Sequence, residues 1–120
     1  MEGSVVYKKF VMYGDLNPAS ALYGGTMMSW VDEAASIFAS EQLGPNTHFV
    51  TLKRREALFE HPARLGDLLT FYASLARTGK TSFGVDVSVY KRDLEIVSCD
   101  VTFVAVDDNG KPTPHSLRFE

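Results

Sequence analysis

The chain has 120 residues and a mass of 13.3 kDa, enough for one hydrophobic core, and we expect residues 1–120 to form a single domain. Hydrophobic residues make up 45% and charged residues 22%, a composition typical of globular proteins rather than of disordered or collagen-like chains. The net charge of -3 argues against a nucleic-acid partner, because proteins that bind the phosphate backbone usually carry a basic excess.

The lone cysteine, Cys99, excludes an intrachain disulfide and argues against a zinc cage, which needs several Cys or His ligands. No segment approaches the roughly 18 apolar residues of a membrane span, and Met1–Met12 lacks the apolar run of a signal peptide. We therefore expect a cytoplasmic protein that neither binds a metal nor enters a membrane.

The first part of the chain predicts one strand and one helix. A strand is expected over Val5–Met12, followed by a turn-rich loop over Tyr13–Tyr23. From about residue 25 to residue 43, apolar side chains recur at steps of three and four, and a Gly-Pro pair ends the run. Small and apolar residues occupy much of this helix, as expected of a helix that is covered on several sides.

Beyond Pro45 the apolar residues alternate, which is typical of strands. Further strands are predicted at His48–Phe59, Asp67–Arg77, Ser82–Lys91 and Glu95–Val106. Turn residues separate them, and the last three are expected to form a meander of hairpins. One helix among these strands predicts an α+β domain in which a curved antiparallel sheet covers the helix.

The junction between the loop and the helix is best suited to chemistry. Gly24 and Gly25 would let a ligand approach the first free N–H groups of the helix, which can bind an oxyanion such as that of a thioester. Asp32 borders the apolar stripe, where an unpaired carboxylate is costly. It is therefore either a functional group or an exposed or salt-bridged helix acid, whereas Glu33 is expected to face solvent.

Several segments carry a resemblance to a known family: Asp15–Asn17, Leu22–Gly25, Met28–Ala34, Gly66–Ala73, Thr78–Ser82 and Thr102–Pro112. They are similar to the hot-dog acyl-CoA thioesterases of the acyl-CoA hydrolase family, and the likeness covers nearly the whole chain. The resemblance implies a hot-dog fold, in which a curved antiparallel sheet of five to six strands wraps one central helix. The loop departs from the family pattern at Tyr13-Gly14 and at Pro18–Ala21, near the expected acyl chain.

The resemblance also implies a function in lipid metabolism, the hydrolysis of acyl-CoA to coenzyme A and a carboxylic acid. Coenzyme A would enter only as part of the substrate and product, with no separate cofactor. It further implies a homo-oligomer, a dimer that can assemble into a hexamer as a trimer of dimers, with each site shared between subunits. Asp32 would act as general base or nucleophile, Asn17 of the facing subunit would orient water or the carbonyl, and the backbone of Gly24 and Gly25 would contact the carbonyl oxygen.

Two basic segments are candidates for the phosphates of coenzyme A. Cations and hydroxyl groups gather at one predicted hairpin, in Arg77, Lys80, Thr81 and Ser82. A solvated turn is the alternative. The basic run at residues 53–55 on a predicted strand is either a solvated face or the lining of a phosphate-binding opening.

Two other functions fit the same architecture. Gly14–Pro18 also resembles part of the motif of the MaoC-like enoyl-CoA hydratases, but that family expects a histidine where this chain has Ser20. The other alternative is a non-catalytic module that binds acyl-CoA.

Overall fold

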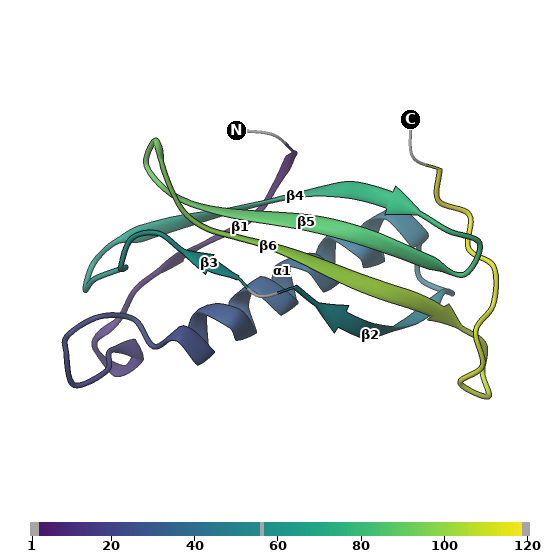
Figure 1. The fold of residues 1–120 in the computed structure, drawn as a ribbon, viewed down its shortest axis with the longest axis horizontal. Coiled ribbons are helices and arrows are strands. Elements are labelled where there is room, and N and C mark those ends of the chain that lie inside the picture. The colour runs from purple at the N-terminus through teal and green to yellow at the C-terminus, as the bar shows by residue number, and fades with distance from the viewer. Residues whose placement is uncertain (1–2, 56, 119–120) are drawn as a thin grey trace.

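The computed structural model describes residues 3–55 and 57–118, in which an antiparallel sheet lies along one helix (Figure 1). Positions 1, 2, 56, 119 and 120 lie outside the described residues, so the predicted 1–120 domain and the predicted strand at His48–Phe59 are described only in part. Within the described ranges, no helix combines the length and apolar character that spanning a membrane requires.

The strands in chain order are β1 (Ser4–Phe10), β2 (His48–Arg54), β3 (Leu58–Phe59), β4 (Leu68–Thr78), β5 (Ser82–Lys91) and β6 (Leu94–Val106). Helix α1 (Gly24–Leu43) and a short 3-10 turn (Tyr13–Asp15) lie between β1 and β2. The sheet order is β1-β4-β5-β6-β2, and β3 pairs with β6 along the same edge as β2. The predicted α+β class and the meander of β4, β5 and β6 are confirmed.

The prediction of one continuous strand at His48–Phe59 is wrong, because the structure has two strands there, β2 and β3. The register of β2 on β6 shifts between Thr51 and Lys53, where an extra residue forms a bulge. A bulge bends a strand and increases its twist. β2 ends at Arg54, the N–H of Arg55 still donates to the carbonyl of Asp100 in β6, and the regular ladder with β6 resumes at Leu58.

The core lies between one face of the sheet and one side of α1. Phe71, Phe83 and Phe103 contribute large buried side chains from β4, β5 and β6. The buried residues of α1 are Met27, Val31, Ala34, Ala35, Phe38 and Ala39. Small alanine side chains let the helix pack close to the sheet. The exposed residues of the other side include Ser29, Glu33, Ile37 and Ser40. Within this chain the helix is therefore covered on one side, not on several as predicted.

A hydrogen bond from Tyr7 fixes the helix against β1. The Tyr7 hydroxyl donates to the backbone carbonyl of Trp30 at 2.6 Å. Burial raises the pKa of Tyr7, and the Glu33 carboxylate raises it further. The phenol thus stays protonated and remains a donor. Since Tyr7 holds one flank of α1 at the β1 side of the sheet, the opposite flank faces the edge formed by β2 and β3.

Candidate functional site

A groove lies between α1 and the edge of the sheet that β2 and β3 form. Its volume is about 400 Å³. It is lined by Met28, Arg54, Arg55, Ala57 and Phe59. Residues four apart on a helix lie on the same face, so Gly24, Met28 and Asp32 share the flank that faces this groove. Gly24 lies beside the aromatic wall, because a Cβ atom there would be 3.9 Å from Cζ of Phe59.

Asp32 is held by an ion pair across this groove. Oδ2 accepts a hydrogen bond from Nη1 of Arg54 at 2.8 Å. The other carboxylate oxygen, Oδ1, is buried and has no hydrogen-bond partner, and no other buried side-chain nitrogen or oxygen atom of the described residues shares that state. Buried polar atoms nearly always have partners, so this exception requires an explanation, and a catalytic role is one. Asp32 is therefore a helix acid with one oxygen in an ion pair and the other without a hydrogen bond.

The start of α1 presents free backbone donors. Tyr23 caps the helix without a side-chain hydrogen bond, and the first turn contains no acidic residue. The first intrahelical bond runs from the N–H of Met27 to the carbonyl of Tyr23. In the described chain, the N–H groups of residues 24–26 donate to no other group. A Cβ atom at Gly25 would meet nothing within 4 Å, so the space beside these donors is open.

Asn17 organises the loop that leads into the helix. Its Oδ1 accepts from the backbone N–H groups of Ala19 at 2.9 Å and Ala21 at 3.1 Å. Its Nδ2 donates to no group among residues 3–55 and 57–118. The loop lies beyond the N-terminal end of α1 (Figure 1). Asn17 thus does not contact Asp32 of its own chain, and its predicted role toward Asp32 of a facing subunit stays a prediction.

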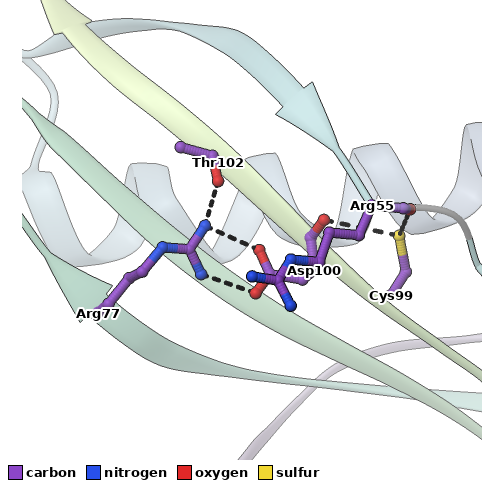
Figure 2. A network of polar contacts seen from close by, with 5 residues as sticks. All are labelled: Arg55, Arg77, Cys99, Asp100 and Thr102. Carbon is purple, nitrogen blue, oxygen red and sulfur yellow. Dashed lines mark hydrogen bonds and ion pairs between the residues drawn. The ribbon is translucent and has the colours of Figure 1, made fainter.

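Arg77, which is predicted to contact coenzyme A, forms hydrogen bonds within the sheet (Figure 2). Its Nη1 and Nη2 donate to the two carboxylate oxygens of Asp100 at 2.7 and 3.0 Å, and Nη2 also donates to the Thr102 hydroxyl. The hydrogen bonds and charge of Asp100 raise the pKa of Arg77. The guanidinium passes over Gly84 of β5, where a Cβ atom would lie 2.5 Å from Cζ of Arg77.

The rest of that predicted phosphate site lies at the hairpin between β4 and β5. There the carbonyl groups of Thr81 and Ser82 accept backbone hydrogen bonds from Ala105 and Gly79. This hairpin and the start of α1 lie at opposite ends of the molecule (Figure 1). One chain therefore brings Asp32 and Gly24 together along the groove but does not bring Lys80, Thr81 or Ser82 to them.

Sequence reasoning includes Arg54 in a candidate phosphate-binding run but misses its ion pair with Asp32. The basic run at residues 53–55 is a signal, but charge alone does not indicate which cation reaches Asp32. Cys99, whose sulfur lies 3.5 Å from the carbonyl oxygen of Arg55, is buried, as predicted. Burial raises the pKa of its thiol, and the negative charge of Asp32 raises it further. The thiol is therefore a packing group with little nucleophilic character.

Comparisons with known proteins agree with this architecture. The sequence model of the thioesterase superfamily matches residues 19–98. A protein of Buchnera aphidicola named as an uncharacterized acyl-CoA thioester hydrolase is 30% identical over 92% of this chain and 87% of its own length.

Two solved structures have the same fold. A hexameric hot-dog thioesterase of Campylobacter jejuni is 32% identical with a TM-score of 0.81, covering 95% of this chain and 91% of that one. An acyl-CoA hydrolase of Staphylococcus aureus, solved with butyryl coenzyme A, is 30% identical with a TM-score of 0.83, covering 91% of this chain and 69% of that one. With its helix against an antiparallel sheet and a family match over residues 19–98, this hot-dog chain belongs to the thioesterase superfamily.

Proposed function

We propose that this protein hydrolyses acyl-CoA thioesters to coenzyme A and a carboxylic acid in the groove between α1 and the β2–β3 edge. The observation that carries the proposal is the Asp32 carboxylate, which lies beside the groove and has one buried oxygen with no hydrogen-bond partner among the described residues. The substrate class follows the relatives, which are named acyl-CoA thioester hydrolases or are bound to butyryl coenzyme A. The apolar side chains of Met28 and Phe59 suit the acyl chain.

Asp32 supplies either a base or a nucleophile. As a base it takes a proton from water while the water oxygen bonds to the thioester carbon; the C–S bond then breaks, and the proton passes to the thiolate of coenzyme A. As a nucleophile it displaces the thiolate to form a mixed anhydride, which water cleaves. A single turnover in heavy-oxygen water separates the two routes, because only the anhydride route can place the label in Asp32. Neither route needs a metal or a cofactor.

The free N–H groups at the start of α1 are suited to the developing negative charge on the carbonyl oxygen. They are preorganised by the helix, and the dipole adds a positive potential. Gly24 and Gly25 add no side chain that would keep the carbonyl at a distance. Hydrogen bonds of this kind contribute typically a factor of about 100 to 1000 in rate.

The proposal includes self-association, with Asn17 of one subunit completing the site of another. Two observations support it. Strand β2 lies at an edge of the sheet with Val50 and Leu52 more than half exposed, and Phe59 of β3 on the same edge is 50% exposed. The similar Campylobacter jejuni protein is hexameric. We propose a dimer through this edge that assembles further into a hexamer. Sedimentation at micromolar concentration tests the proposal, and a stable monomer would contradict it.

Mixing two inactive variants tests whether the site is shared. Asn17→Asp keeps the oxygen that holds the loop but removes the Nδ2 donor, and Asp32→Asn removes the carboxylate. If the site joins Asp32 of one subunit to Asn17 of the other, half of the subunit pairs are mixed and one of their two sites is intact. Activity should then return to about a quarter of the wild-type value. No recovery after verified subunit exchange would contradict a shared site.

The primary experiment measures thiol release from short, medium and long acyl-CoAs. Asp32→Asn should lower kcat by roughly 100-fold or more, the usual effect of removing a positioned acid–base group. Glu33→Gln is the matched control, because this neighbouring helix acid is exposed and points away from the groove; it should retain activity. Ligand-induced thermal stabilisation without turnover would instead indicate a module that binds acyl-CoA.

A further inference from the structure

The solvent-facing oxygen of Asp32 is the one that accepts the hydrogen bond from Arg54. The Asp32 side chain is 39% exposed, yet its Oδ1 has essentially no accessible surface. The accessible part therefore includes Oδ2. That oxygen accepts the 2.8 Å hydrogen bond from Nη1 of Arg54. A water molecule or thioester that approached the carboxylate from the groove would meet this ion pair.

A guanidinium that donates to this oxygen occupies the lone pair that would otherwise take a proton from water or attack the thioester carbon. Rotating the side chain to expose Oδ1 would break the same ion pair. Either route to reaction therefore requires Arg54 to move away from Asp32. The free-energy cost is modest, since both side chains are partly exposed, at 42% and 39%, and such pairs are typically weak.

Arg54 is placed to respond to an anion. It lies in the last position of β2, just beyond the bulge, and its neighbour Arg55 lines the same groove. The groove wall thus carries two arginines beside one aspartate. A guanidinium binds phosphate or carboxylate groups through paired hydrogen bonds.

We propose that Arg54 masks Asp32 in the empty site and that an anionic group of the substrate draws Arg54 away, which exposes the carboxylate. This inference rests on the proposed thioesterase function and adds a specificity to it. Substrates that carry an anion within reach of Arg54 release the base, whereas neutral thioesters react only when the ion pair opens without that help and are therefore hydrolysed more slowly. The anion is a phosphate of coenzyme A or a carboxylate on the acyl group.

The first test uses the wild-type protein and a truncated neutral substrate, the butyryl thioester of N-acetylcysteamine. Inorganic pyrophosphate in trans should raise kcat for this ester, because it draws Arg54 from Asp32. The succinyl thioester of N-acetylcysteamine distinguishes the sources of the anion. If a carboxylate on the acyl group suffices, this ester is hydrolysed faster than the butyryl ester without pyrophosphate. Inhibition or no change by pyrophosphate, together with equal rates for the two esters, overturns the proposal.

The second test changes Arg54. Arg54→Met should raise kcat for the neutral ester about fivefold, the factor that corresponds to a weak ion pair, and should abolish the effect of pyrophosphate. Arg54→Lys keeps a cation beside Asp32 but loses the paired donors of the guanidinium, so it should keep the low rate on the neutral ester and respond more weakly to pyrophosphate than the wild type. Lys53→Met is the control, because it removes a charge from the adjacent position outside the groove lining. It should leave the rate on the neutral ester unchanged, both with and without pyrophosphate.

A lower or unchanged kcat of Arg54→Met on the neutral ester would overturn the masking role. If Arg54→Met does not fold, the pyrophosphate response of the wild type decides the question. Failure of the proposed function is a separate result: the wild type would then release no thiol from butyryl-CoA, and Asp32→Asn would not differ from it.

Discussion

Replacing Gly84 by alanine should destabilise the protein, although alanine is normally the better residue in a strand. The Cβ atom would lie 2.5 Å from both Cζ and Nη1 of Arg77, closer than real Cβ contacts occur. The guanidinium must shift, and it then loses its paired hydrogen bonds to Asp100. Asp100 would keep its charge with only 17% of its side chain exposed.

Loss of this paired contact should lower the free energy of unfolding by about 1 to 2 kcal/mol. For a chain of this size, that is a fall in Tm of about 4 to 8 °C. In an Arg77→Met background the clash is absent, because the guanidinium is gone. Gly84→Ala should there stabilise by about 0.5 kcal/mol, since alanine restricts the unfolded chain more than glycine does.

Urea denaturation of the wild type, both single variants and the double variant measures this coupling directly. The change caused by Gly84→Ala should reverse its sign between the two backgrounds. Equal effects in both backgrounds, or stabilisation of the wild-type chain, would refute the packing of Arg77 over Gly84.

Tyr7→Phe should lower the free energy of unfolding by about 1 kcal/mol in urea denaturation, because the hydrogen bond to the Trp30 carbonyl is lost. Partial desolvation and the Asp100 carboxylate raise the pKa of Asp86, so its charge opposes folding at neutral pH. Asp86→Asn should therefore raise Tm by about 1 to 2 °C at neutral pH, and the gain should vanish well below about pH 4, where the Asp86 carboxyl is protonated in both the folded and the unfolded chain. Cys99 should react with thiol reagents much more slowly in the native chain than after denaturation; rapid native labelling would contradict its burial.

Most of the fold follows from the period of the hydrophobic pattern. The prediction for Ser82–Lys91 matches β5 residue for residue, and α1 starts one residue before the predicted Gly25. Both segments lie between clear turn signals and have a consistent period. The break between β2 and β3 could not be predicted, because it depends on how the residues after Thr51 pair with β6.

The candidate site could be predicted only as far as local geometry reaches. Helical spacing places Asp32 at the border of the apolar stripe, and this prediction is confirmed by its half-buried carboxylate. Its pairing with Arg54 joins a helix to a strand and depends on tertiary packing. Likewise, the sequence shows that Arg77 is a cation near a turn but not that Asp100, two strands away, binds it.

The two ends of the Asn17 side chain constrain which residues this position can accept. The oxygen shapes the loop through two backbone contacts, while the nitrogen donates to no group of the described residues and, in the proposed function, serves a neighbouring subunit. Aspartate would keep the loop and lose the donor, alanine would lose both, and glutamine is one methylene too long for the same turn. Random mutagenesis screened for folding alone should therefore accept aspartate at position 17, whereas a screen for turnover should accept only asparagine.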